Sequence, residues 1–335
     1  MFQSARSPSV GCGISRRMES ARIAPPPGMG LQKGISSALP FCQIHVPPEG
    51  GGFKLYKEFL MKDETTLSVA VMSGKGGVGK SNIALNLGYA LSQAGYPLLL
   101  MDCDLGLANL DVLLGIAPEG NLQQVIMDER AASDIIYPIS EKGRGYFDIL
   151  PAASGVPELA EMDADMRDLL LRRLEPELRK YSAVLLDLGA GINGTVRSFA
   201  AMAAVRLLVM TPEPTSLTDS YSLVKVLNAQ LGIRDFLVVV NDVESKEEET
   251  AIFERLSLAC GRFLGFTPVL LGSVRHDPAM SRAVCRQQPL LKVEPEAPAA
   301  KDILRLSGEL LKIRGVMAGR LKGNPVLRNL ARAEN

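Results

Sequence analysis

Short apolar runs of strand length alternate, from Thr66 onward, with longer stretches in which apolar residues recur every three or four positions. Runs such as LSVAVMS, SAVLLDL and DFLVVVN are almost continuously apolar, which is typical of strands covered on both faces of a sheet. After the first run, Ile83, Leu87 and Leu91 form one stripe of a predicted helix that stops at Gly95. Strands that alternate with helices predict an α/β fold, with a doubly wound, mainly parallel sheet and helices on both faces. We expect strands over residues 67–73, 97–102, 146–152, 182–188, 205–211, 235–241 and 267–274, and helices over 81–95, 167–181 and 216–232.

Residues 1–60 do not share this pattern. They are rich in Ser, Arg, Gly and Pro, and segments such as APPPGMG and PPEGGG break regular elements. They contain no continuous apolar segment of the kind found in secretory signals, although an Arg-rich, acid-poor composition also fits an organelle transit peptide. We interpret them as a disordered leader or as the product of a mis-assigned start, with Met61 as the alternative first residue.

Composition narrows the classes of function. The 37 basic and 37 acidic residues give zero net charge, so a globally basic surface for nucleic acid is not indicated. The cysteines contain no CxxC pair, which argues against a zinc site, an iron–sulfur scaffold and a disulfide framework, and favours a reducing cytoplasm. No apolar run approaches the roughly 20 residues that span a bilayer. The cysteines are Cys12, Cys42, Cys103, Cys260 and Cys285.

A phosphate-binding loop is predicted where the first strand gives way to a helix. Residues 74–81 fit G-x-x-x-x-G-K-[ST], and the strand before them and the helix after them are the context that the motif requires. The glycines let backbone N–H groups converge on phosphate oxygens, and the helix N-terminus adds positive potential. Lys80 is expected to contact the β and γ phosphates, and the hydroxyl of Ser81 to ligate Mg²⁺.

Acidic residues end two further predicted strands. Asp102 and Asp104 follow the second apolar run, and Asp187 lies in the run VLLDLGAGING. Ligands of doubly wound sheets bind at the carboxyl ends of the strands, so these carboxylates are expected beside the phosphate loop. There they can hold Mg²⁺, directly or through water, and position an attacking water. We expect Asp102 to be structural, and Asp111 to be a helix cap.

The loop KGGVGK resembles the deviant Walker A loop of the MinD/ParA group of ATPases. The similarity covers about residues 67–311. The segments DCDLGLANLDVLLG, DLGAGI, TPEPTSLTDSYSLVKVL and RAVCRQQPLL are most similar to the flagellar-number regulators FlhG (FleN or YlxH), with the division-site ATPase MinD close behind. This resemblance implies a MinD-like P-loop ATPase domain over residues 61–315, followed by a basic tail over 316–335 that can be amphipathic.

The resemblance also implies roles for individual residues. Lys75 would reach across a face-to-face homodimer to the phosphates of the partner's ATP, as an arginine finger supplied in trans does. Asp104 would orient the catalytic water, and Asp187 would be linked to Mg²⁺, so that the metal set is Ser81, Asp104 and Asp187. Lys75, Lys80 and Asp104 would then be catalytic.

The resemblance further implies a pocket for the adenine base and a helix that faces the partner in the dimer. An asparagine at the position of Asn241 reads the adenine edge in this family, although a turn residue that ends a strand would look the same. The segment GSVRHDPAM would close the adenine side, and the family often has proline where Arg275 stands. TPEPTSLTDSYS would begin the helix that meets the partner, although Asp219 there could equally be a first-turn acid. His276 is expected to be a surface residue. The predicted nucleotide contacts are Gly74, Lys75, Gly76, Gly77, Val78, Gly79, Lys80, Ser81, Asn82, Pro212, Asn241 and Arg275.

The resulting hypothesis is an ATP-hydrolysing dimerisation switch that positions or counts a cellular structure, with flagella favoured. Relatives commonly carry an N-terminal D-Q-A-x-x-L-R motif that engages the GTPase FlhF, and residues 1–70 contain no such motif. An FlhF-like GTPase and a flagellar basal-body component are the candidate partners that would stimulate turnover. The alternatives are a MinD-type division-site ATPase, a ParA-type DNA-segregation ATPase, for which nucleic acid is a disfavoured partner, and a cobyrinic-diamide-synthase-like amidoligase, for which no glutaminase domain is evident.

The C-terminal tail leaves two interpretations open. Residues 312–335 contain six basic residues and one acid. Apolar residues between them could form an amphipathic helix that binds the inner face of the cell membrane, but Gly319, Gly323 and Pro325 would interrupt it. A solvated tail on a cytoplasmic protein is the alternative. The apolar residues in question are Val316, Met317, Leu321, Val326, Leu327 and Leu330.

Overall fold

The computed structural model describes residues 65–104, 109–127, 130–140, 145–152 and 163–328. The predicted leader, residues 1–60, and Leu330 of the tail lie outside these ranges. No helix in the described part of the chain combines the length and the apolar character needed to cross a membrane.

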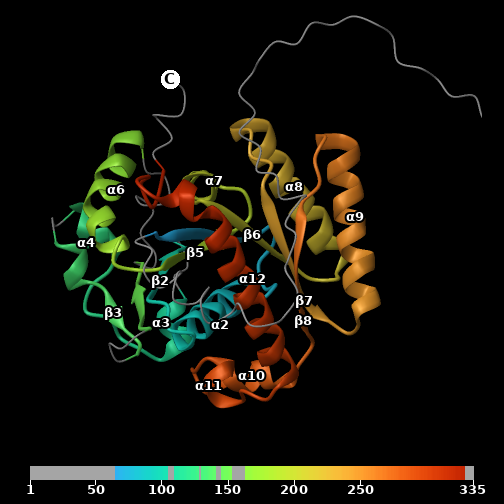
Figure 1. Ribbon diagram of the computed structural model, residues 1–335, viewed down its shortest axis with the longest axis horizontal. Coiled ribbons are helices and arrows are strands. Elements are labelled where there is room, and N and C mark those ends of the chain that lie inside the picture. Colours follow the sequence, from blue (N-terminus) through green and yellow to red (C-terminus); the bar gives the residue numbers. More distant parts are fainter. Residues whose placement is uncertain (1–64, 105–108, 128–129, 141–144, 153–162, 329–335) are drawn as a thin grey trace, which may run out of the picture. The chain divides into compact units, whose positions relative to one another are not determined.

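An eight-stranded sheet in the order β3-β4-β2-β5-β1-β6-β7-β8 forms the centre of the fold (Figure 1). Every neighbouring pair is parallel except β3 and β4, so the predicted doubly wound, mainly parallel sheet is confirmed. All seven predicted strands are present, and the two-residue strand β3 is an addition at one edge. The strands are β1 (Leu67–Ser73), β2 (Leu98–Cys103), β3 (Tyr137–Pro138), β4 (Phe147–Leu150), β5 (Ala183–Ala190), β6 (Val205–Met210), β7 (Phe236–Val243) and β8 (Val269–Arg275).

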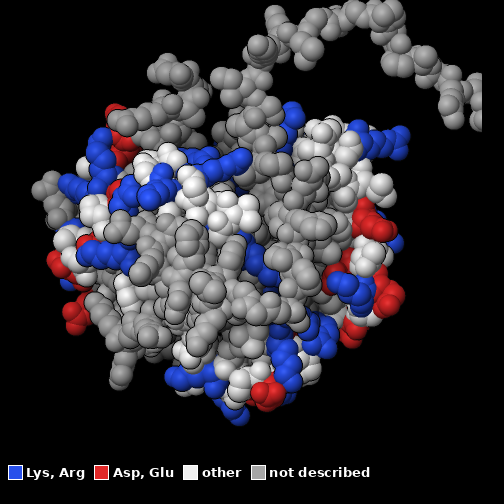
Figure 2. All heavy atoms as spheres, in the orientation of Figure 1, with Lys and Arg blue, Asp and Glu red and all other residues white. Residues whose placement is uncertain are grey.

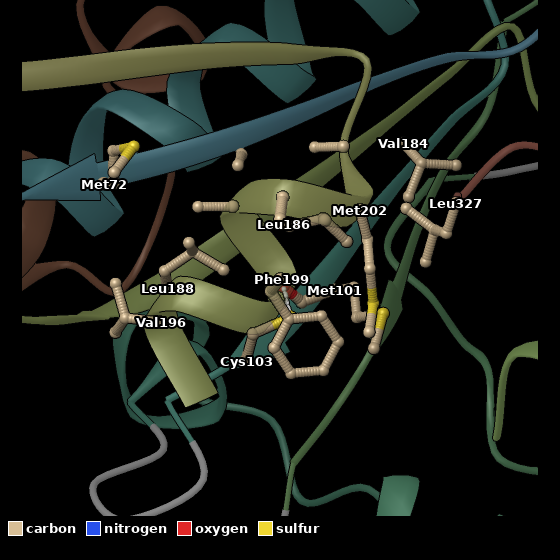
Figure 3. Close-up of a cluster of buried hydrophobic side chains, with 14 of the residues drawn as sticks. Met72, Met101, Cys103, Val184, Leu186, Leu188, Val196, Phe199, Met202 and Leu327 are labelled. Carbon is tan, nitrogen blue, oxygen red and sulfur yellow. Dashed lines mark hydrogen bonds between the residues drawn. The ribbon is translucent and has the colours of Figure 1, made fainter. Parts of the chain in front are cut away.

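Helices cover both faces of the sheet because its strands are apolar on both sides. In β1, Ala70 and Met72 point into one core with α4 and α6–α9, whereas Val69 and Val71 point into the other with α2 and α10–α12. Figure 3 shows part of the first core, where Phe199 of α7 lies among strand residues. The helices are α2 (Lys80–Gln93), α3 (Leu110–Leu114), α4 (Leu122–Met127), η2 (Ala132–Asp134), α6 (Ala164–Leu178), α7 (Gly194–Met202), α8 (Pro214–Leu231), α9 (Lys246–Leu264), α10 (Pro278–Cys285), α11 (Leu290–Val293) and α12 (Pro298–Leu321).

The C-terminal segment is packed into the domain. The boundary predicted between residues 315 and 316 falls inside α12, which runs through Gly319 without interruption and ends at Leu321. Val326 and Leu327 are then only 5% and 2% exposed and belong to the core that contains α6 and α7. Figure 3 shows Leu327 close to Val184 and Met202.

Hydrogen bonds fix this segment in place. The hydroxyl of Ser68 in β1 donates to the carbonyl of Val326 over 2.6 Å, and the backbone N–H of Arg328 donates to the carbonyl of Met202 over 2.9 Å. The interpretation of Val326 and Leu327 as lipid-facing residues is therefore wrong for this conformation, because protein already covers both side chains.

Truncation of Leu327 tests this docking. We expect Leu327→Ala to cost about 2–4 kcal/mol of unfolding free energy and to lower the melting temperature by roughly 5–10 °C, because it opens a cavity in a packed core. Leu304→Ala is the matched control: Leu304 lies on α12 and is 45% exposed, so its truncation should change stability by less than about 0.5 kcal/mol. Equal melting temperatures for the two variants would show that the segment does not pack as described.

Candidate active site

The phosphate loop lies between β1 and α2 and depends on two of its glycines. A Cβ at Gly74 would collide with the backbone of Asp219 in α8. Gly79 has φ +84°, and a Cβ there would collide with the side-chain amide of Asn241. The loop therefore fits between α8 and the end of β7 only with glycine at these positions. Gly79 precedes the first turn of α2 without a side-chain cap, which leaves the N-terminal N–H groups of a 14-residue helix facing the loop.

Lys80 points into the protein. Its side chain is 9% exposed, and its Nζ lies 2.5 Å from Oδ1 of Asp187 and 3.3 Å from Oγ of Ser81. Burial raises the pKa of Asp187, while the neighbouring Lys80 ammonium acts to lower it. The structure thus brings together three of the predicted site residues, from the loop, from α2 and from β5. A triphosphate entering the loop would compete with Asp187 for the ammonium group.

Asp102 organises the chain that follows β2. It stands beside Asp187 in the β2–β5 register. Its carboxylate accepts the N–H groups of Asp104, Asn109 and Leu110 at 3.0, 3.2 and 3.3 Å. Burial first, and then the charge of Asp187, raise the pKa of Asp102 to about 7. This geometry gives Asp102 the structural role that was expected of it.

Asp104 lies just after β2, close to the backbone that follows Asp187 in β5. A Cβ built on Gly189 would come within 3.2 Å of Oδ1 of Asp104, so this carboxylate rests against the backbone that follows Asp187. The second and fifth strands therefore bring two predicted metal-binding carboxylates to the same edge of the sheet, beside Ser81. Asp111, by contrast, is not a helix cap. It lies inside the first turn of α3, where its side chain accepts the N–H of Val112.

Lys75 points the other way from Lys80. Its side chain is 33% exposed, its Nζ forms an ion pair with Glu213, and it donates to Oγ1 of Thr215 over 3.0 Å. Both partners stand at the start of α8, which places Lys75 on the outside of the loop. Asp219, considered as a first-turn acid, is instead the sixth residue of α8, where its backbone packs on Gly74.

The two residues predicted to contact the adenine base, Asn241 and Arg275, have different surroundings. Asn241 at the end of β7 donates from Nδ2 to the carbonyl of Val78 over 2.9 Å, so it touches the phosphate loop directly. Arg275 does not extend toward the loop. Its Nε and Nη2 donate to Oδ2 and Oδ1 of Asp302 in α12 over 2.8 and 3.0 Å, and a role at the adenine would require this buried carboxylate to release it. Pro212 is half-buried just before α8.

Asn82 lies in the first turn of α2, where its carbonyl accepts from Asn86. Asp242 and His276 form a further pair at the sheet edge, 2.7 Å apart, which sequence reasoning did not connect. The pairing of Lys75 with Glu213 was also missed. In both pairs the two side chains have opposite or complementary charge, but no sequence motif or spacing indicated that they would meet.

Metal binding would need more than side chains. In the described ranges, no group of three or more His, Cys, Asp or Glu residues is arranged to hold a metal ion. The hydroxyl of Ser81 and the carboxylate of Asp187 offer oxygen donors, which suit Mg²⁺ when the phosphate oxygens of a nucleotide supply further ligands.

Comparisons with known proteins agree with the fold. The family profile described as "CobQ/CobB/MinD/ParA nucleotide binding domain" matches residues 69–290. The antiactivator FleN of Pseudomonas aeruginosa is 35% identical over 232 residues, which cover 69% of this chain and 81% of FleN. The flagellum site-determining protein YlxH of Helicobacter pylori is 31% identical over 257 residues, which cover 76% of this chain and 85% of YlxH. The structure of the septum site-determining protein MinD of Pyrococcus horikoshii, complexed with Mg-ADP, aligns with a TM-score of 0.62 at 26% identity and covers 75% of this chain and 98% of that one.

Proposed function

The chain belongs to the CobQ/CobB/MinD/ParA nucleotide-binding family, and from that premise we propose that it is an ATPase that forms a homodimer when it binds ATP and separates after hydrolysis. The observation that supports this proposal most strongly is that the two lysines of one loop point in different directions. Lys80 is buried against Asp187, whereas Lys75 is partly exposed and held by residues of α8.

In the proposed dimer, Lys75 serves the nucleotide of the neighbouring molecule. Its contacts with Glu213 and Thr215 keep the ammonium outside its own phosphate loop, at a surface where a second molecule can approach. Formation of the dimer would exchange the Glu213 contact for the phosphates of the partner's nucleotide, so that the ATP cage closes only in a pair.

Hydrolysis requires Asp104 in this account. Its carboxylate, which lies against Gly189, would orient the water that attacks the terminal phosphorus. The products are ADP and inorganic phosphate. Mg²⁺, held by Ser81 and Asp187 together with the phosphate oxygens, would neutralise negative charge on the transferred group. The contact of Asp104 with Gly189, and its charge, which acts to raise the pKa of Asp187, support this assignment. We propose that a partner protein accelerates the slow intrinsic turnover.

The biological role that we propose is control of the number or placement of flagella. YlxH, 31% identical over most of the chain, is named as a flagellum site-determining protein, and FleN, 35% identical, is named as an antiactivator. The chain also resembles MinD, whose name refers to the division septum. A DNA-segregation role is less well supported, because the net charge is zero and the face in Figure 2 carries side chains of both signs around its rim.

We propose that the protein works in the cytoplasm, with contact to the membrane as an optional step. Any such contact would have to begin at the end of α12, where Arg320 and Lys322 stand near the exposed Val316. Val326 and Leu327 could contact the membrane only after they leave the protein core.

A deletion strain distinguishes the candidate roles. We expect cells that lack the chain to carry an altered number of flagella, counted by electron microscopy. Wild-type protein should restore the count, whereas the Lys80→Ala variant should not. An unaltered count combined with misplaced septa would favour the MinD-type alternative, and an unaltered count combined with chromosome loss would favour the ParA type.

A further inference from the structure

A bulge interrupts the pairing of β7 with β8 beside the phosphate loop. Asn241 pairs with Val274 and Val243 pairs with Arg275, so Asp242 between them has no residue opposite it on β8. Asp242 has φ +64°, one of two positive values among non-glycine residues in the described part of the chain. A non-glycine residue keeps such a conformation where its surroundings fix it.

His276 fixes the bulge from both sides. Its Nδ1 lies 2.7 Å from Oδ1 of Asp242, and its backbone N–H donates to the carbonyl of Val243 over 2.9 Å. His276 thus holds both the side chain of Asp242 and the carbonyl of the next residue, Val243. Both side chains are more than half exposed, so solvent protons reach the pair.

The bulge directs Asn241 onto the phosphate loop. A bulge re-aims the neighbouring side chain, and here Asn241 reaches the carbonyl of Val78 over 2.9 Å and lies against Gly79. Val78 and Gly79 immediately precede Lys80. The contacts therefore run without a gap from His276 through the bulge to the part of the loop that receives phosphate.

We propose that His276 and Asp242 form a clamp that holds Asn241 against the phosphate loop and so preorganises the nucleotide pocket. His276 is a positioning residue in this account, because it acts through Asp242 and Asn241. The inference rests on the proposed nucleotide-binding function of the loop. It assigns a role to a histidine that sequence analysis expected only to lie on the surface.

The charges around the clamp predict how it depends on pH. The hydrogen bond to Asp242 raises the pKa of His276, and the charges of Asp242, Glu244 and Asp277 act in the same direction. Arg275, the preceding residue, is turned toward Asp302. The protonated imidazole donates a charge-assisted bond to Asp242, which is lost as the pH rises through the raised pKa. The clamp therefore strengthens nucleotide binding below that pKa and contributes less above it.

The test measures the dissociation constant of a non-hydrolysable ATP analogue with Mg²⁺ by calorimetry from about pH 5.5 to about pH 8.5. The γ-phosphate also titrates in this range, so the quantity to compare is the ratio of the His276→Gln constant to the wild-type constant. We expect this ratio to be about three- to fivefold at the acidic end and to fall toward one at the basic end. For His45→Gln, which changes the other of the two histidines, the ratio of its constant to the wild-type constant should be one at every pH.

A double-variant comparison and a titration complete the test. Asp242→Asn keeps a residue that tolerates positive φ but removes the charge, and combining it with His276→Gln should weaken binding no further than either change alone. By NMR, the pKa of the His276 imidazole should fall in Asp242→Asn. A pH-independent ratio, additive effects or an unchanged imidazole pKa would overturn the clamp. Wild-type protein that binds no analogue at any pH would instead overturn the proposed function.

Discussion

Lys80→Ala will bind ATP at least about 100-fold more weakly than the wild type, because a buried ammonium that meets phosphate charge contributes far more than an exposed one. The Lys80 side chain is 9% exposed, and its Nζ contacts Asp187 and Ser81. Its removal takes away the positive charge and also leaves the Asp187 carboxylate buried without that ammonium. Calorimetric titration with ATP and Mg²⁺ measures the first effect, and thermal denaturation measures the second.

Two controls separate binding from stability. The double variant Lys80→Ala/Asp187→Asn no longer buries a lone carboxylate, so we expect it to recover part of the melting temperature while still failing to bind ATP. Lys75→Ala changes a lysine of the same loop whose side chain points outward, and the monomer should keep its ATP affinity within about threefold. Normal ATP affinity in a folded Lys80→Ala variant would refute the assignment of the loop.

Asp104→Ala will bind ATP within about threefold of the wild type but hydrolyse it at least about 100-fold more slowly, because the residue acts on the attacking water and not on the nucleotide. Release of phosphate under saturating ATP measures turnover. Because we propose that hydrolysis separates the pair, we expect the variant to remain associated for as long as ATP is present.

Asp111→Ala is the matched control, since it removes a carboxylate of the same chain segment whose side chain accepts only the N–H of the next residue, Val112. Its turnover should be that of the wild type. Wild-type turnover in Asp104→Ala would contradict the role given to Asp104, and equal losses in both variants would point to a general effect on the segment after β2.

The fold was predictable because its strands are buried on both faces. Continuous apolar runs such as those of β1, β5 and β7 arise from that burial and need no knowledge of neighbours. The two-residue strand β3, Tyr137–Pro138, is too short to form any pattern. The phosphate loop was predictable because phosphate binding requires particular residues next to one another. The motif therefore occupies one contiguous stretch of the sequence.

Contacts between distant residues were not predictable in the same way. Lys75 and Glu213 are 138 positions apart, and Asp242 and His276 are 34 apart. Arg275 was assigned to the adenine by resemblance, whereas the structure pairs it with Asp302, 27 positions later. A pairing of this kind depends on which strand ends and helices meet, and the residue types alone are compatible with several partners.

The tail shows how composition can mislead. Apolar residues interspersed with arginine and lysine suit a membrane surface, but the same apolar residues also suit an open place in a protein core. The structure offers such a place between β1, α6 and α7, and Val326 and Leu327 occupy it. Only the presence of that site in the fold decides between the two interpretations.

The central claim is that a lysine donated by a second copy of the chain completes the ATP site, and the mass of the Asp104→Ala variant in solution with ATP and Mg²⁺ tests it most directly. Light scattering should give about twice 36.0 kDa for Asp104→Ala, and 36.0 kDa when Lys75→Ala is added to the same chain. A single-chain mass for Asp104→Ala, or a dimer that persists without Lys75, would contradict the account.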